Sequence, residues 1–213
     1  RTMMNKIKSP YSAAITGCGF QFYEFQRVFP LLMDANSKTL LQDEIENNRL
    51  LQVNSRKARR TFVLEFKRRF ASVRYNFWEA WNGMSEQGQK AGLFYSILKT
   101  YKLLFDFHFD VTVKKWNSVE QQLMPSDLEM DMNEIAAKDE FVDGWSELTK
   151  RKCISQYMTI LKQVGLLTAE GKLKPVHFNA ADSAWYFHTG ETWFFEACLM
   201  HPYEIKDLKE QLQ

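Results

Sequence analysis

The chain has 213 residues, 45% of them hydrophobic and 15% aromatic, which is enough apolar material for a packed core and excludes a disordered protein. Nine Gly and five Pro residues supply few of the tight turns that an all-β sandwich needs, so the composition favours helices. The 28 Lys and Arg residues nearly balance the 26 Asp and Glu residues, so a surface that binds polyanions has to come from how the charges are distributed.

The sequence shows no pattern of a metal site, a membrane span or an exported protein. Cys18, Cys153 and Cys198 are widely spaced, with no CxxC or HxxxH pattern, so we expect no structural zinc and no other cofactor. It contains no run of about 18 apolar residues and no signal peptide. We therefore expect a cytoplasmic protein without membrane association.

The first third of the chain predicts three helices. Apolar residues recur at helical spacing between residues 20 and 33. Ser37 is the predicted N-cap of a short helix that ends near residue 48, and Ser55 caps a longer helix that reaches about Arg74. A short helix, a turn and a longer basic helix predict a helix-turn-helix-like element, which we assign to an N-terminal domain of residues 1–82.

The helix predicted from Ser55 to Arg74 is strongly basic. It carries eight Lys and Arg residues and one acidic residue, Glu65. On a helical wheel most of these cations gather opposite the apolar arc, where like charges repel one another unless a partner neutralises them. A phosphate backbone is a common partner of such a face, so we predict a surface that binds duplex DNA. Its predicted members approach the groove or hold phosphates: Ser55, Arg56, Lys57, Arg59, Arg60, Lys67 and Arg68.

Residues 83–125 predict connecting helices, the first running from a cap at Ser85 to Thr100 and the second from Tyr101 to Trp116. An acidic stretch follows. Residues 117–143 contain eight Asp and Glu residues and one Lys. This stretch leaves a second interpretation open, in which it neutralises the basic helix within the same molecule.

Residues 126–213 predict a second, winged-helix-like domain. A helix capped by Ser146 runs to Val164, Gly165 is its predicted stop, and residues 166–174 predict a short β-hairpin. Polar and basic residues of this helix and hairpin suit contacts with phosphates and base edges. The predicted DNA-binding set here is Thr149, Arg151, Lys152, Ser155, Lys172 and Lys174.

Two closing helices, over residues 182–198 and 203–211, complete the prediction, the last started by Pro202. The expected fold is therefore mostly α. It is a helical bundle with an N-terminal helix-turn-helix-like element and a C-terminal winged-helix-like element that carries a short β-hairpin.

Six segments carry a family resemblance: Gly92–Lys99, Leu103–Phe107, Trp116, Trp145–Lys152, Ile160–Leu167 and the basic run Ser55–Arg60. They resemble the BrxA family of bacterial BREX phage-defence systems. The resemblance spans residues 19–173 and implies a small, helical, DNA-binding accessory protein without catalytic chemistry of its own. It also implies partners in the same defence system that carry out methylation and ATP hydrolysis. A fold-level likeness of such proteins to the RNA-binding NusB type keeps RNA open.

No pattern in the sequence predicts an enzyme. It contains no GxxxxGK[ST] or GxGxxG loop, its four histidines are scattered, and Cys18 has no nearby base in the sequence. We therefore expect neither catalysis nor a small-molecule substrate. Two alternatives to duplex DNA binding remain: an adaptor within the defence complex that docks partners through the acidic stretch and exposed aromatics, and an RNA-binding protein of the NusB-like type.

Overall fold

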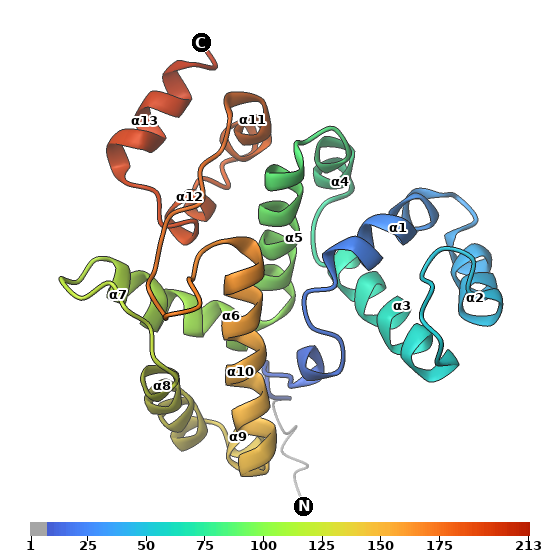
Figure 1. Ribbon diagram of the computed structural model, residues 1–213, viewed down its shortest axis with the longest axis horizontal. Helices are drawn as coiled ribbons and strands as arrows, with labels where there is room; N and C mark the ends of the chain where they lie inside the picture. Colours follow the sequence, from blue (N-terminus) through green and yellow to red (C-terminus); the bar gives the residue numbers. More distant parts are fainter. Residues whose placement is uncertain (1–7) are drawn as a thin grey trace, which may run out of the picture.

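The computed structural model describes residues 8–213 and is mostly helical (Figure 1). The first seven residues of the predicted N-terminal domain lie outside the described residues. In chain order the elements are the 3-10 helix η1 (Ala14–Gly17), α1 (Phe22–Met33), α2 (Ser37–Asn47), α3 (Arg56–Ala71), α4 (Tyr75–Asn82), α5 (Glu86–Thr100), α6 (Lys102–Asp106), the π-helix η2 (Phe107–Thr112), α7 (Val113–Trp116), α8 (Pro125–Lys138), α9 (Glu140–Asp143), α10 (Glu147–Val164), α11 (Ala180–Thr189), α12 (Trp193–Ala197) and α13 (Pro202–Glu210).

Three predicted serine caps are confirmed, and they explain where the long helices begin. The hydroxyl of Ser55 accepts the Ala58 N–H at the start of α3, and Ser85 and Ser146 cap α5 and α10 in the same way. Gly165 ends α10 with a φ of 100°, a left-handed conformation that glycine adopts without a steric penalty.

Other predicted boundaries are wrong. The residue that precedes α2 is Asn36 rather than Ser37. The basic helix ends at Ala71, and Arg74 directly precedes α4. Glycine accounts for a further difference, because Gly190 takes a φ of 75° and divides the single helix predicted over residues 182–198 into α11 and α12.

The helix predicted from Tyr101 to Trp116 is also divided. Its middle, η2, is a π-helix, with α6 before it and α7 after it. The extra residue per turn in a π-helix shifts the side chains that follow, and it commonly occurs where tertiary contacts require such a shift. Local apolar spacing carries no signal for it.

The predicted β-hairpin is present only as isolated bridges, and no extended strand occurs within residues 8–213. Leu167 pairs with Leu173 in an antiparallel bridge, and the N–H of Thr168 donates to the carbonyl of Lys172 at 2.9 Å. A third segment joins from the other side, because Gln122 forms an antiparallel bridge with Lys172. Three short stretches of chain therefore pair where two were predicted.

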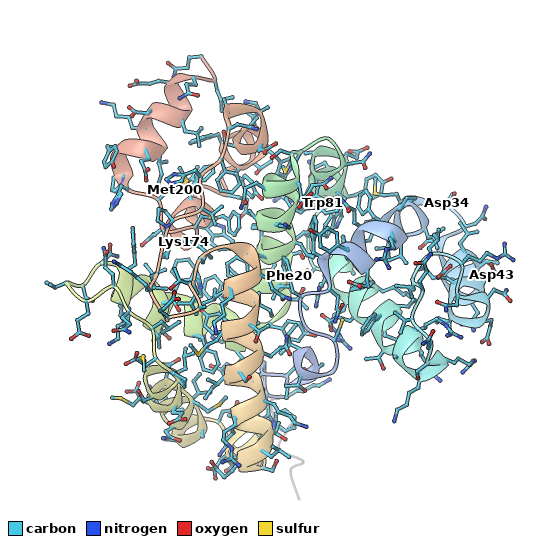
Figure 2. All side chains as sticks on the ribbon, in the orientation of Figure 1. Phe20, Asp34, Asp43, Trp81, Lys174 and Met200 are labelled. Carbon is cyan, nitrogen blue, oxygen red and sulfur yellow. The ribbon has the colours of Figure 1, made fainter. Side chains whose placement is uncertain are left out.

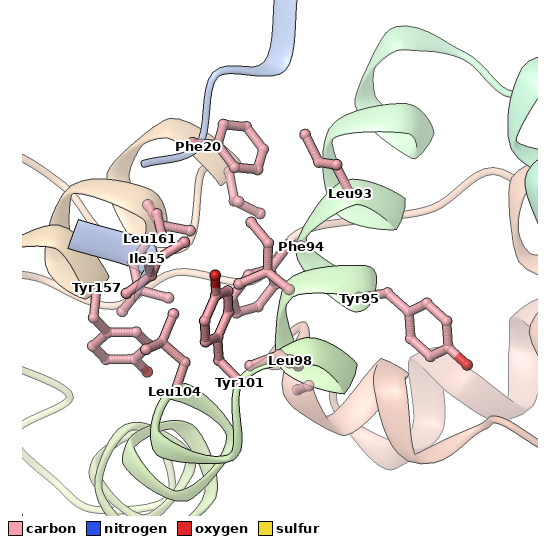
Figure 3. Packing of buried hydrophobic residues seen from close by; sticks show 14 of the residues in the cluster. Ile15, Phe20, Leu93, Phe94, Tyr95, Leu98, Tyr101, Leu104, Tyr157 and Leu161 are labelled. Carbon is pink, nitrogen blue, oxygen red and sulfur yellow. The ribbon is translucent and has the colours of Figure 1, made fainter. Parts of the chain in front are cut away.

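Helix α5 lies at the centre of the core. Its residues Ala91–Leu98 are all buried, and α3, α4, α6 and α10 pack on different sides of it. Ile15 of η1 lies beside α10, and Phe20 lies between the ribbons of α10 and α5 (Figure 3). The buried hydrophobic side chains form one cluster from Ile15 to Leu208, so all three predicted regions contribute to a common core (Figure 2).

A buried polar network ties α10 to η2 and α12. The carbonyl of Ala197 can only accept, so Nε2 of His108 donates to it at 2.6 Å. Nδ1 of the neutral ring therefore accepts, and the Tyr157 hydroxyl donates to it at 2.7 Å. Thr112 then donates to the Tyr157 oxygen at 2.6 Å. Each hydrogen bond in this network fixes the direction of the next one.

This network makes stability depend on pH. Burial lowers the pKa of His108 to about 4, against an opposing hydrogen bond to Ala197. Between pH 6.5 and pH 4 the unfolded chain binds a proton that the folded chain excludes. The free energy of unfolding should therefore decrease as the pH is lowered, by about 1.4 kcal/mol per pH unit. Urea unfolding at pH 7 and pH 5 checks this. The His108→Phe variant should be less stable than the native chain at pH 7, but its free energy of unfolding should decrease less between pH 7 and pH 5. An equal decrease in both proteins would contradict the lowered pKa assigned to His108.

Within residues 8–213 no helix has the length and apolar character needed to cross a bilayer.

Candidate nucleic-acid interface

The first three helices form a compact unit in which α2 and α3 pack on each other and on α1. The turn between α2 and α3 is held by a buried carboxylate. Glu44 is only 2% exposed, and its Oε1 accepts the N–H groups of Leu50 and Leu51 at 2.8 and 2.7 Å. Its Oε2 accepts the Arg49 N–H at 3.2 Å. These bonds set the direction in which the chain enters α3.

Glu44→Ala should therefore destabilise the protein by about 3 kcal/mol, because three backbone N–H groups of the turn, including that of buried Leu51, lose a charged acceptor. Chemical denaturation measures this. Gln42→Ala is the matched control on the same helix, since Gln42 is exposed and should leave stability nearly unchanged. A loss below about 1 kcal/mol in Glu44→Ala would contradict the role given to this carboxylate.

Arg59 does not belong to the exposed surface, which corrects one predicted member of the DNA-binding set. It is 7% exposed, and its guanidinium lies against the end of α2 and the turn. Nε donates to the carbonyl of Ile45 at 2.7 Å, and Nη1 donates to those of Val53 and Asn54 at 2.8 and 2.9 Å. These bonds to three carbonyls explain why this cation lies on the apolar side of α3.

A second cation, Arg69, is completely buried. It donates to Glu65 at 3.0 Å, to the carbonyl of Phe20 at 2.7 Å and to that of Gly19. Glu65, 2% exposed, also accepts from the Tyr101 hydroxyl at 2.5 Å and from Arg68 at 2.6 Å. This network fixes the segment before α1 against α3.

Two predicted members of the DNA-binding set are exposed but already form ion pairs with carboxylates of the same chain. Arg56 forms a two-pronged ion pair with Glu46 of α2, at 2.5 and 2.8 Å, and 56% of its side chain remains exposed. Arg68 is 47% exposed and pairs with Glu65. Ser55 is exposed but caps α3.

Lys57, Arg60 and Lys67 are exposed and make no ion pair with any residue of the described chain. They share one arc of α3 with Leu64, which is 49% exposed. The arc borders a groove of about 820 Å³ between α2 and α3, whose rim includes Arg56, Arg60, Lys67 and also Lys38, a cation that the sequence reasoning missed.

The acidic stretch does not neutralise this arc. In the described part of the chain the ion pairs of α3 go to Glu46 and Glu65, and none goes to residues 117–143. Helix α8, which carries much of the acidic stretch, lies at the lower left in Figure 1, and α3 lies at the right. The net charge of this arc therefore remains positive.

Helix α10 carries a second exposed arc. Apart from Glu147 in the first turn, which lies outside the arc, its exposed residues fall within about one third of the helix circumference: Leu148, Arg151, Lys152, Ser155, Thr159, Lys162 and Gln163. The arc contains three cations and no carboxylate. Thr149 is half-buried and bonded to Ser146, so this predicted member contributes little. Lys162 was missed, although its i+7 spacing from Ser155 places it on the same arc.

Lys172 and Lys174 are exposed on the short bridged segment that follows α10, and neither forms an ion pair within residues 8–213. The described residues also contain no group of three or more His, Cys, Asp or Glu side chains arranged to hold a metal ion. The structure thus offers two basic surfaces and no metal centre in the part of the chain that it describes.

Comparisons with known proteins agree with this architecture. The crystal structure of an uncharacterized protein from Magnetospirillum magneticum is similar, with a TM-score of 0.75 over 90% of this chain and 99% of that one. The two share 20% sequence identity, so this likeness shows the fold alone. No curated protein matches the chain. The BrxA family profile matches residues 9–183, well over half of the chain. The chain therefore belongs to the BrxA family of BREX phage-defence components.

Proposed function

We propose that this protein binds duplex DNA, without catalysing a reaction, as an accessory component of a BREX defence system. The observation that carries the proposal is the pair of exposed basic arcs. Lys57, Arg60 and Lys67 on α3, and Arg151 and Lys152 on α10, are solvent-exposed cations without internal counterions in the described chain. Such cations bind a phosphate backbone because binding releases its condensed counterions.

The packing of α1, α2 and α3 supports a helix-turn-helix interpretation of the first arc. In that motif the second helix of the pair enters the major groove with its N-terminal residues foremost. Here α3 takes that position, and Arg56, Lys57 and Arg60 lie in its first turns. Glu44 and Arg59, which hold the turn, would set its angle of approach.

The order of elements around α10 supports a winged-helix interpretation of the second arc. A helical segment ending in α7 precedes residues 121–123, which pair with residues 171–173; α8 and α10 come between them. The N–H of Leu123 donates to the carbonyl of Gly171 at 2.9 Å, and that of Leu173 donates to Gln121 at 2.9 Å. A wing built in this way carries Lys172 and Lys174 next to the helix that would read the groove.

Fluorescence anisotropy of a labelled duplex across a series of salt concentrations tests the proposal. The logarithm of the binding constant should fall linearly with the logarithm of salt, with a slope of about −0.9 for each phosphate contacted. Duplexes of unrelated sequence should bind with similar affinity if phosphate contacts dominate. If the protein bound no duplex at low salt, the proposed function would be wrong.

The same surface would attract RNA, so the measurement includes competition with an unlabelled RNA hairpin of equal charge. Displacement by the hairpin at lower concentration than by the duplex would favour RNA. The adaptor alternative draws on exposed apolar side chains near the acidic helix, such as Met130 at 67% and Phe141 at 56% exposure. Co-purification with a defence component, without retention on heparin, would favour the adaptor.

A further inference from the structure

We propose that a trough between α8 and η2 docks a basic amphipathic helix of a partner protein. This inference goes beyond the proposed function, because it concerns the acidic side of the molecule and does not depend on DNA binding. The trough consists of three adjoining hollows of about 840, 240 and 1040 Å³. Asp110, Asp131 and Glu134 border the first two hollows, and Lys138 borders all three, so the hollows follow one another along α8.

One face of α8 forms the long wall of the trough. Asp127, Met130, Glu134 and Lys138 succeed one another at intervals of three or four residues, so they lie on the same side of the helix. They extend from the first turn of α8 to its last residue, over roughly 16 Å at the usual rise of about 1.5 Å per residue. A partner helix of roughly three to four turns matches the length of this wall.

Carboxylates outnumber cations around the trough. The three hollows are bordered by eight Asp and Glu residues and four Lys residues. Of these lysines, Lys115 is already paired with Asp127 at 3.2 Å. Asp110, Asp131 and Glu134 form no ion pair within residues 8–213. The trough therefore keeps a net negative charge, which a basic helix would complement.

Asp131 lies at the middle of α8 and lacks a partner. Its Oδ2 is buried and accepts no hydrogen bond from any residue of the described chain. Burial raises the pKa of this carboxyl to about 6, and repulsion from Asp110, Glu134 and Asp106 adds to the increase against the attraction of Lys114. A Lys or Arg side chain of a partner would stabilise the ionised carboxyl, because it would supply the missing donor and a positive charge.

Apolar side chains are exposed along the same trough. Val119 and Met130 border the first hollow and Phe141 borders the third. Val119 is fully exposed, Met130 is 67% exposed and Phe141 is 56% exposed. Exposed apolar residues that gather in this way mark contacts with other proteins, where Met and aromatic side chains are enriched. They favour a protein segment with an apolar face over a free cation as the occupant.

The trough is separate from the two basic arcs. Its carboxylates would repel the phosphates of a nucleic acid. Glu129 borders the hollow beside α10 and lies about 140° around α8 from Glu134, so the trough opens away from the α10 arc. Helix α3 lies on the other side of the molecule (Figure 1). A partner in the trough therefore leaves both arcs free.

A fluorescent peptide of Lys and Leu, about 14 residues long with its leucines on one helical face, is the probe. We expect it to bind the native chain with micromolar affinity at about 0.1 M salt, and the same peptide with Glu in place of Lys not to bind. Asp131→Asn together with Glu134→Gln should weaken binding roughly 10-fold, and Met130→Ser should weaken it several-fold. The two charge substitutions keep the side-chain shape and remove repulsion, so the variant should unfold at the same temperature as the native chain or above it.

The matched control removes the same charges elsewhere. Asp207→Asn with Glu210→Gln, on the exposed side of α13, should change the affinity by less than about two-fold. Equal losses in the two double variants would show that the peptide responds only to net charge, and the trough would be overturned as its site. Absence of peptide binding to the native chain would overturn the inference too, and the proposed function would stand.

The pH dependence of peptide binding gives an independent readout. Asp131 gains a proton in the free protein between pH 7 and pH 5, because its pKa is about 6, whereas the bound peptide favours the ionised carboxyl. Affinity for the basic peptide should therefore fall roughly 10-fold from pH 7 to pH 5. The fall should be smaller in Asp131→Asn; an equal fall in both proteins would contradict the position of the peptide beside Asp131.

Sedimentation of the native chain tests the other occupant, a second copy of this chain. We expect a single species of monomer mass across a range of protein concentrations. Self-association that disappears in the Asp131→Asn, Glu134→Gln variant would make a second copy the occupant, and it would overturn the assignment to a different protein.

Discussion

Replacing Lys57, Arg60 and Lys67 together with alanine should weaken duplex binding roughly 100-fold at 0.1 M salt, because three phosphate-neutralising cations are lost. The slope of log affinity against log salt should become shallower by about 0.9 for each cation removed, or about 2.7 in total. Anisotropy titrations of the native chain and this variant measure both quantities. The side chains are exposed and unpaired within the described chain, so stability should change little.

The matched control removes the same charge elsewhere. Lys138, Lys206 and Lys209 are exposed on α8 and α13, and their replacement with alanine changes the net charge equally. Affinity should then fall by a few-fold at most, through the weaker overall field. Equal losses in both triple variants would mean that binding responds only to net charge, and α3 would lose its assigned role.

Arg69→Met should destabilise the protein by about 3–5 kcal/mol, which is the largest effect expected on stability. The substitution removes the fully buried one of the two arginines that pair with Glu65, and it leaves the carbonyls of Gly19 and Phe20 without this donor. The free energy of unfolding from urea titrations measures the loss.

A double variant separates the ion pair from simple packing. Glu65→Leu with Arg69→Met replaces both charges with apolar side chains and should be more stable than the sum of the two single losses, because no unpaired charge remains buried. Strict additivity would show that Glu65 and Arg69 do not interact energetically, in conflict with their 3.0 Å contact.

The helical period of the sequence correctly separated the two faces of α3, yet it could not decide the role of Arg59. That residue lies on the apolar arc, between Phe66 and Phe70 on a helical wheel. A long cationic side chain on such an arc can still extend to solvent. Three carbonyls, contributed by Ile45, Val53 and Asn54, keep it inside, and their positions follow from tertiary packing.

The same difference between local sequence patterns and tertiary contacts applies to the segment that follows α10. The Glu170-Gly171 pair predicted a chain reversal, and Gly171 does take a left-handed φ of 86°. The pairing of residues 121–123 with that reversal was not predictable, because it joins segments about fifty residues apart without a shared pattern. The position of Gly17-Cys18-Gly19 between α3 and α10 likewise follows only from the fold, because nothing in the local sequence indicates it.

The most direct measurement of the central claim is lysine footprinting, in which reductive methylation with and without duplex DNA is compared by mass spectrometry. DNA should protect Lys57, Lys67, Lys152, Lys162, Lys172 and Lys174, and Lys206 and Lys209 on α13 should react equally in both samples. Protection confined to α13, with the lysines of α3 and α10 still reactive, would contradict it.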